Sequence, residues 1–154
     1  MKRFYKIIAT PFSWLYGFVV WLRNLLYEER ILPSSSVDVP TICIGNLAVG
    51  GTGKTPMTEY LIRLLSDKYN VAILSRGYGR KTSGFRIAGS DDTADTIGDE
   101  PMLIHMHFPE IPVAVCANRV EGIKRLCKLY PKVQCVILDD AFQHRRLRCG
   151  YYIL

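Results

Sequence analysis

The chain has 154 residues, of which 49% are hydrophobic and 22% charged, and its net charge is +6. This balance excludes a disordered tail, and the length suits one α/β domain with a short additional segment. The five cysteines include no Cys-x-x-Cys pair, and the three histidines have no spacing typical of metal ligands. We therefore expect a reduced, cytosolic chain without a disulfide framework or a zinc site.

The first predicted element is an apolar, aromatic helix within Phe4–Leu26, where only Lys6 and Arg23 are charged. Its length is close to that of a bilayer span, and its aromatic rings suit a membrane interface. Half of the excess positive charge lies in the first thirty residues, which favours an anionic membrane surface over nucleic acid. We predict a membrane-associated helix over residues 1–32, spanning or surface-bound, and a linker over 33–40. A helix packed on the domain's own core is the alternative.

Residues 41–154 alternate between strand and helix patterns. The predicted strands are Thr41–Ile44, Val71–Ser75, Pro112–Cys116 and Val133–Leu138, followed by a fifth that opens at Tyr151. The predicted helices are Thr55–Lys68, Pro101–Phe108 and Arg119–Tyr130. The intervening stretch Arg76–Asp99 reads as too polar for the core. This order predicts a mostly parallel sheet with helices on both faces, and ligands at the carboxyl ends of the strands. Because the chain stops at a strand, we expect a fragment that lacks its C-terminal half.

The stretch between the first strand and the first helix, residues 45–56, reads GNLAVGGTGKTP. From Ala48 to Thr55 it matches the phosphate-binding loop G-x-x-x-x-G-K-[ST], with alanine at the first glycine. Glycines let the backbone approach an anion, so that successive N–H groups point into one concavity. Lys54 would reach the β- and γ-phosphates, and the Thr55 hydroxyl would bind Mg²⁺.

This stretch predicts a P-loop NTPase-like core whose nucleotide-binding residues are Ala48, Val49, Gly50, Gly51, Thr52, Gly53, Lys54 and Thr55. The helix that follows adds the partial positive charge of its N-terminus. Its apolar residues at helical spacing are Met57, Tyr60, Leu61, Leu64 and Leu65. The alternative is a glycine-rich turn before an ordinary helix.

An apolar strand later in the chain ends in two carboxylates, Asp139 and Asp140. Behind a phosphate loop, an aspartate at this point completes the Mg²⁺ shell opposite the loop threonine. Thr55 and Asp139 are therefore the candidate metal ligands. The alternative is a helix-capping or solvated aspartate. His144 follows closely, although a lone histidine is more often structural.

Two further motifs follow predicted strands. SRGYGR, residues 75–80, is either an anion-binding loop or a solvated turn. GDEP, residues 98–101, opens a helix, where Asp99 or Glu100 could act as a cap. Alternatively, Asp99 faces the γ-phosphate and accepts a proton from an attacking hydroxyl. The spacing does not distinguish these two roles.

Together the motifs resemble the lipid A 4'-kinase family, the tetraacyldisaccharide 4'-kinases. The matching segments are GNLAVGGTGKTP, SRGYGR, GDEP and DDAFQH, together with the apolar aromatic N-terminal helix. They occur in the family's order and cover nearly the whole chain. The family's usual Asp-Asp-Gly-Phe-Gln-His has Ala141 in place of its glycine.

The resemblance implies an enzyme that uses ATP and Mg²⁺ to phosphorylate the 4'-hydroxyl of a tetraacyldisaccharide 1-phosphate at the cytoplasmic face of the bacterial inner membrane. It implies that Asp99 accepts a proton, that Asp139 and Asp140 lie at the Mg²⁺ and γ-phosphate, and that His144 is near them. The family has a second half that this chain lacks. A membrane-associated P-loop switch and an inactive truncated product are the alternatives, although the guanine motif Asn-Lys-x-Asp does not occur.

Overall fold

The computed structural model describes residues 14, 16–22, 25, 26, 29, 35–45, 53–139 and 147–154. The predicted site residues 48–52, Asp140 and His144 lie outside this set. Residue contacts divide the chain into two units, residues 1–34 and residues 35–154, which are described separately.

The second unit is built on a six-stranded sheet with the order β3-β4-β2-β5-β1-β6. The strands are β1 (Thr41–Ile44), β2 (Val71–Ser75), β3 (Arg86–Ile87), β4 (Val113–Val115), β5 (Cys135–Asp139) and β6 (Tyr151–Ile153). Every neighbouring pair is parallel except β3 with β4. The predicted mostly parallel sheet is therefore confirmed, with strand ends shifted by one or two residues in β4 and β5.

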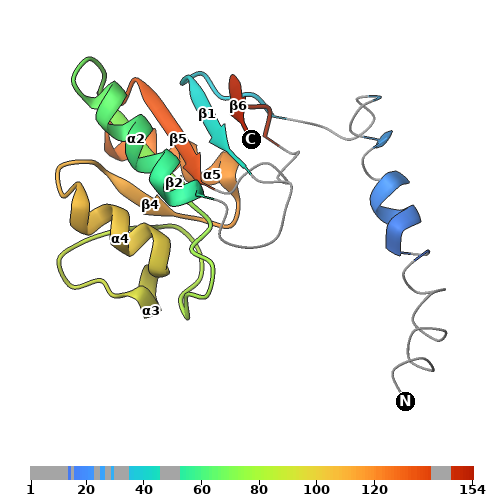
Figure 1. The fold of residues 1–154 in the computed structure, drawn as a ribbon, viewed down its shortest axis with the longest axis horizontal. Helices are drawn as coiled ribbons and strands as arrows, with labels where there is room; N and C mark the ends of the chain where they lie inside the picture. Colours follow the sequence, from blue (N-terminus) through green and yellow to red (C-terminus); the bar gives the residue numbers. More distant parts are fainter. Residues whose placement is uncertain are drawn as a thin grey trace. The chain divides into compact units, whose positions relative to one another are not determined.

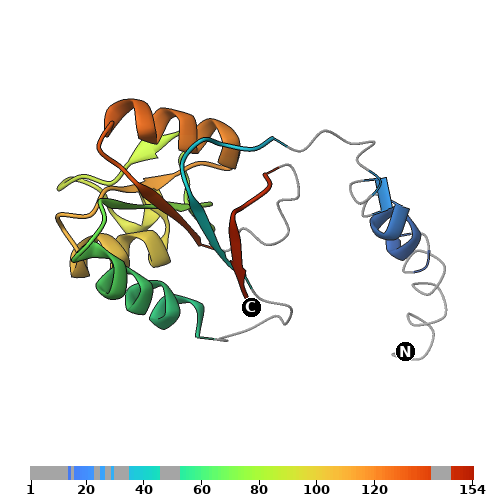
Figure 2. The same cartoon turned by 90° about the horizontal axis from the view of Figure 1, so that it is seen from above.

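Helices cover both faces of this sheet (Figure 1). They are α2 (Lys54–Ser66), α3 (Ala94–Ile97), α4 (Asp99–His107) and α5 (Arg119–Leu129). Figure 2 shows α5 on one face and α2 and α4 on the other. Two hydrophobic clusters result, one beneath α5 and one beneath α2 and α4. All residues of β2 and β5 are buried, as expected for apolar strands in a parallel sheet with both faces covered.

Only part of the apolar set at helical spacing in α2 faces the core. Leu61 and Ile62 are buried, but Met57, Tyr60 and Leu64 are exposed. The buried side also includes Thr58, whose hydroxyl donates to the carbonyl of Lys54 at 3.0 Å. A hydroxyl that is satisfied within its own helix can face the core, so the apolar residues alone do not locate the buried side.

The prediction that Arg76–Asp99 is too polar for the core holds for most of this stretch, but not for all of it. The stretch supplies β3 and α3, and the side chains of Ile97 and Asp92 are 0% and 7% exposed. Asp92 is paired with Arg86, as described below, and pairing is what allows a charged side chain to be buried.

The described residues of the first unit include a helical segment over residues 16–22. Its aromatic side chains Trp14, Tyr16, Phe18 and Trp21 are all more than half exposed, and the rings of Phe18 and Trp21 lie 5.9 Å apart. Among the described residues, no helix combines the length and the apolar character needed to cross a bilayer.

Candidate functional site

The carboxyl ends of β1, β5 and β6 meet where the phosphate loop begins. In the parallel register, Ile44 at the end of β1 pairs with Asp139 on β5 and with Ile153 on β6. The backbone N–H of Gly45 donates to the carbonyl of Ile153 at 2.9 Å. Asp139 therefore lies on the strand next to the one that leads into the loop.

The far end of the loop leads into α2 through Gly53. Its φ of 78° and ψ of 18° are left-handed, a conformation that favours glycine because it has no Cβ. Its carbonyl accepts the first helical hydrogen bond from the N–H of Met57 at 3.1 Å. Lys54 and Thr55 are then the first two helical residues, and the first turn contains no acidic side chain. The positive end of the helix dipole is thus available to an anion.

Thr55 and Asp139 fit a magnesium ion in the kind of ligand they offer. Asp139 is 1% exposed and ends β5, whereas Thr55 is half-buried in the first turn of α2. Mg²⁺ prefers oxygen ligands, and nucleotide sites typically hold it with one or two protein oxygens, substrate phosphates and water. Within the described ranges no cluster of three or more His, Cys, Asp or Glu could form a complete protein cage. The residues present suit an ion delivered with a nucleotide.

The start of α4, which carries Asp99, packs on the turn at the carboxyl end of β2. A Cβ on Gly77 would come within 2.8 Å of the Ile97 carbonyl, and one on Gly98 within 2.9 Å of the Tyr78 carbonyl. Both glycines have positive φ, 70° and 98°. These two positions need glycine because the turn after β2 packs directly on the start of α4.

Asp99 is the exposed first residue of α4. The N-cap position is Gly98, so neither Asp99 nor Glu100 occupies the position that the capping hypothesis requires. A carboxylate in the first turn still interacts favourably with the helix dipole. The structure thus brings Asp99 to the edge of the sheet where the strands end, with its side chain open to a ligand.

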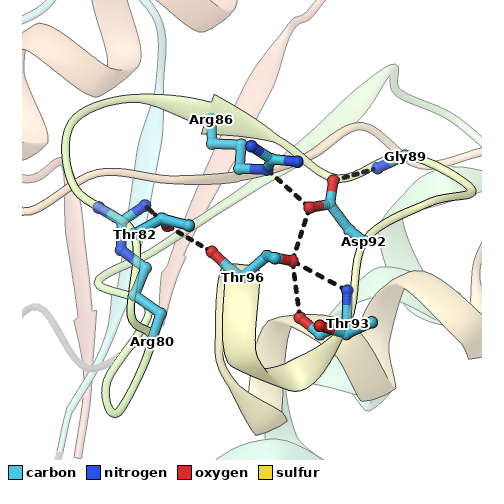
Figure 3. Close-up of polar contacts among 7 residues, drawn as sticks. All are labelled: Arg80, Thr82, Arg86, Gly89, Asp92, Thr93 and Thr96. Atoms are coloured by element: carbon cyan, nitrogen blue, oxygen red, sulfur yellow. Dashed lines mark hydrogen bonds and ion pairs between the residues drawn. The ribbon is translucent and has the colours of Figure 1, made fainter.

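A polar network holds the segment that carries Gly98 (Figure 3). At its centre, Asp92 accepts hydrogen bonds from Arg86 Nε and from the Thr96 hydroxyl, both at 2.6 Å, and from the Gly89 N–H at 3.0 Å. Thr96 Oγ1 also accepts from the N–H of Thr93 at 2.9 Å, which forms a capping box at the start of α3. Gly98 is both the C-cap of α3 and the N-cap of α4. This network therefore fixes the point at which α4 begins, with Asp99 as its first residue.

Burial alone would raise the pKa of Asp92, but the hydrogen bonds from Thr96, Arg86 and Gly89 outweigh it and lower that pKa. The carboxylate therefore stabilises the fold above its unfolded-state pKa of about 3.9. This contribution is lost as the pH falls through the lower pKa of the folded state.

Replacing Asp92 with alanine should lower the free energy of unfolding at neutral pH by about 1–2 kcal/mol, because it leaves three partly buried donors without their acceptor. Asp91→Ala is the matched control, since Asp91 is exposed and should change stability by less than about 0.5 kcal/mol. Urea denaturation measures both. The difference between wild type and Asp92→Ala should shrink below about pH 4. Equal stability of the two variants would show that the network does not hold this segment.

Arg119 lies at the edge of the sheet where the parallel strands end, and the sequence analysis did not single it out. It begins α5 and is 1% exposed, and its Nη1 donates to the carbonyls of Cys116 at 2.6 Å and Ala117 at 3.4 Å. It places a buried positive charge at the carboxyl end of β4. The sequence feature that could have indicated its burial is an arginine in the first turn of a predicted helix. The helix dipole disfavours a cation there unless other groups compensate.

The described fold is a mostly parallel α/β sheet with helices on both faces, and the phosphate-loop sequence lies between β1 and α2. A family model described as tetraacyldisaccharide-1-P 4'-kinase matches residues 5–154. The chain belongs to this family.

Relatives of known name agree with the family match. The chain is 52% identical over 147 residues to the tetraacyldisaccharide 4'-kinase of Flavobacterium johnsoniae, and 54% identical over 145 residues to that of Bacteroides thetaiotaomicron. These alignments cover 96% and 94% of this chain, but only 43% and 38% of the relatives. The chain therefore spans less than half the length of either relative.

A crystal structure of LpxK from Aquifex aeolicus, described as the "apo" form in complex with ATP, is similar with a TM-score of 0.86 and 38% sequence identity. The similarity covers 97% of this chain and 48% of the Aquifex chain. The described fold therefore corresponds to about half of that protein.

Proposed function

We propose that this chain is the nucleotide-binding part of a kinase that transfers the γ-phosphoryl group of ATP to the 4'-hydroxyl of a tetraacyldisaccharide 1-phosphate. The observation that carries the proposal is the pairing of Ile44 with Asp139 beside a left-handed Gly53 at the start of α2, in a chain of this family. This arrangement brings one carboxylate and one helix N-terminus to the same edge of the sheet. Phosphoryl transfer depends on such positioning and on neutralisation of charge.

Each residue of the site has its own proposed role at the phosphates. Lys54 would bind the β- and γ-phosphates, the loop N–H groups would surround them, and Thr55 and Asp139 would hold the metal. When bound, Mg²⁺ supplies charge neutralisation at the phosphate oxygens. Ala48, Val49, Gly50, Gly51 and Thr52 would complete the loop in this proposal, and the DDAFQH motif would add Asp140 and His144 to the site, as the resemblance implies.

Asp99 is the proposed proton acceptor for the sugar hydroxyl. The exposed position of Asp99 at the start of α4, beside the turn that follows β2, supports this proposed role. Because β2 and β5 are neighbours in the sheet, Asp99 approaches from the opposite side of β5 to the phosphate loop. The family favours this kinase over a nucleotide-dependent switch, because the relatives are named as kinases.

We further propose that the first unit attaches the protein to the cytoplasmic face of the bacterial inner membrane. Trp14, Tyr16, Phe18 and Trp21 are 77%, 73%, 56% and 58% exposed, and amphipathic rings favour the membrane interface. Interfacial binding scales with the apolar area that enters the lipid and with attraction between basic residues and anionic lipid. The acylated acceptor would be met at the same surface.

Deleting residues 1–30 should move the protein from the membrane fraction to the soluble fraction. Replacing Trp14 and Trp21 together with alanine should weaken binding to anionic vesicles by at least about tenfold, because two large rings no longer enter the interface. Tyr69→Ala removes an aromatic side chain, 49% exposed, from the second unit and serves as the control. Vesicle sedimentation measures all three proteins. If the truncated protein sediments with vesicles at high salt as the full chain does, another surface carries the attachment.

The experiment for the kinase function is a chimera in which this chain replaces the matching part of the F. johnsoniae relative. The chimera should transfer label from γ-labelled ATP to tetraacyldisaccharide 1-phosphate in the presence of Mg²⁺. If the parent relative labels the lipid and a folded chimera does not, the proposal is wrong. Transfer by this chain without the added half would rule out an inactive truncated product.

A further inference from the structure

Two of the five cysteines form a buried pair away from the phosphate loop. All five lie within the described part of the chain, and all are thiols. Cys43 lies in the middle of β1, and Cys149 lies just before β6. They belong to the same hydrophobic cluster beneath α5, with exposed fractions of 0% and 8%. The proposed kinase chemistry uses neither of them.

The backbone holds Cys149 over β1. In the parallel register Cys43 pairs with Tyr152, and the N–H of Gly150 donates to the hydroxyl of Thr41 at 3.1 Å. The N–H of Cys149 donates to the phenol oxygen of Tyr152 at 3.0 Å. Cys43 thus lies two residues from Thr41, whose hydroxyl binds the residue after Cys149, and both thiols belong to the same hydrophobic cluster. Two segments more than 100 residues apart meet at this point of the sheet.

The surroundings of Cys149 favour a thiolate. The hydrogen bond from Cys43 lowers the pKa of Cys149 most strongly, whereas burial raises it. Side-chain hydrogen bonds from Thr41 and Tyr152, together with the charge of Arg119, lower this pKa further, to about 7. These groups come from β1, β6 and α5. By contrast, burial raises the pKa of Cys127 and of Cys135. Because the thiolate is the nucleophile in disulfide exchange, Cys149 should react before the other two.

We propose that Cys43 and Cys149 are a redox-active pair, which a small disulfide such as glutathione disulfide converts into an intramolecular disulfide between β1 and the segment before β6. The inference does not depend on the kinase function. It assigns a modification site to β1, the strand that leads into the phosphate loop.

The reaction is two successive thiol–disulfide exchanges. The Cys149 thiolate attacks one sulfur of glutathione disulfide, which forms a mixed disulfide and releases one glutathione thiolate. The Cys43 thiol then loses its proton and attacks the Cys149 sulfur, which expels the second glutathione thiolate. The two protein thiols are oxidised, one glutathione disulfide is reduced to two glutathione molecules, and the two protons go to solvent or to the released thiolates.

The test is mass spectrometry of the full chain after incubation with glutathione disulfide and alkylation of the remaining thiols. Wild type should yield a peptide pair joined through Cys43 and Cys149, with Cys127 alkylated. Cys43→Ser should instead retain glutathione on Cys149, because the resolving thiol is absent. Cys127→Ser is the matched control and should form the same cross-link as wild type.

Two further readouts make the outcome decisive. The rate of the first exchange should rise to a plateau with a midpoint near pH 7, the pKa of Cys149. The cross-link closes a loop of roughly 100 residues, so it should raise the melting temperature, and reduction should reverse this change. If Cys43 and Cys149 both remain alkylatable in folded wild-type protein, or if glutathione stays on Cys149 of wild type, the pair is not redox-active. The thiol readout is independent of phosphoryl transfer, so it leaves the kinase proposal untouched.

Discussion

Replacing Lys54 with alanine should lower kcat/KM for ATP in the chimera by about 10²–10³-fold, the usual loss when a preorganised group at a transferring phosphoryl is removed. Lys54 is the first residue of α2, directly after the left-handed Gly53, so its backbone position is fixed by the start of the helix. Solvent does not replace a preorganised charge at comparable strength, because its dipoles must reorient during the reaction.

Lys68→Ala is the matched control for this substitution, because Lys68 is an exposed lysine just beyond the other end of α2. It removes the same charge and should change kcat/KM by less than about twofold, because exposed charges at a distance are screened by salt. Steady-state transfer rates over a range of ATP concentrations measure both variants. If the two variants lose activity equally, Lys54 acts only through net charge and the loop does not bind phosphate.

Asp99→Ala and Asp99→Asn should lower kcat of the chimera by about 10²–10⁴-fold, the range that general-base catalysis contributes. A sugar hydroxyl is a poor nucleophile until its proton has an acceptor. Asp139 would be occupied with Mg²⁺, whose charge makes it a weak base. Asp99 is exposed at the start of α4 and does not hold the metal in this proposal, so it retains the capacity to accept a proton.

The KM for ATP should change little in both Asp99 variants, because the group acts mainly in the transition state. A thermal melt checks that the helix start tolerates the substitutions. Gly98, and not Asp99, is the N-cap of α4, so we expect each variant to lose less than about 1 kcal/mol of stability from the helix dipole. If both variants retain a near wild-type kcat, or if both simply unfold, Asp99 has a structural role and the base lies elsewhere.

Local patterns were sufficient to predict most of the sheet. β1 and β2 have the predicted bounds, and β4 and β5 differ by one or two residues, because short apolar runs after turn residues are strong strand signals. Asp139 ends the strand that pairs with β1, since parallel strand ends meet at one edge of a sheet, and its role as a metal ligand stays a prediction.

The rest depends on contacts between residues distant in sequence. Arg86, Asp92 and Thr96 bury one another's polar groups, and no pattern in a charged, glycine-rich stretch indicates which of its charges will pair. The exposed stripe Met57, Tyr60 and Leu64 looks like a core face until the satisfied Thr58 is known to face inward. Cys43 and Cys149 meet only because β6 adds beside β1.

The measurement that tests the central claim most directly is calorimetric titration of ATP into the wild-type 154-residue chain, with and without Mg²⁺. We expect one saturable site per chain, and weaker binding when Mg²⁺ is omitted, because Thr55 and Asp139 contribute through the metal. A folded chain that binds no ATP at millimolar concentration, or that binds it equally well without Mg²⁺, would contradict a nucleotide site built on the end of β1, the start of α2 and Asp139.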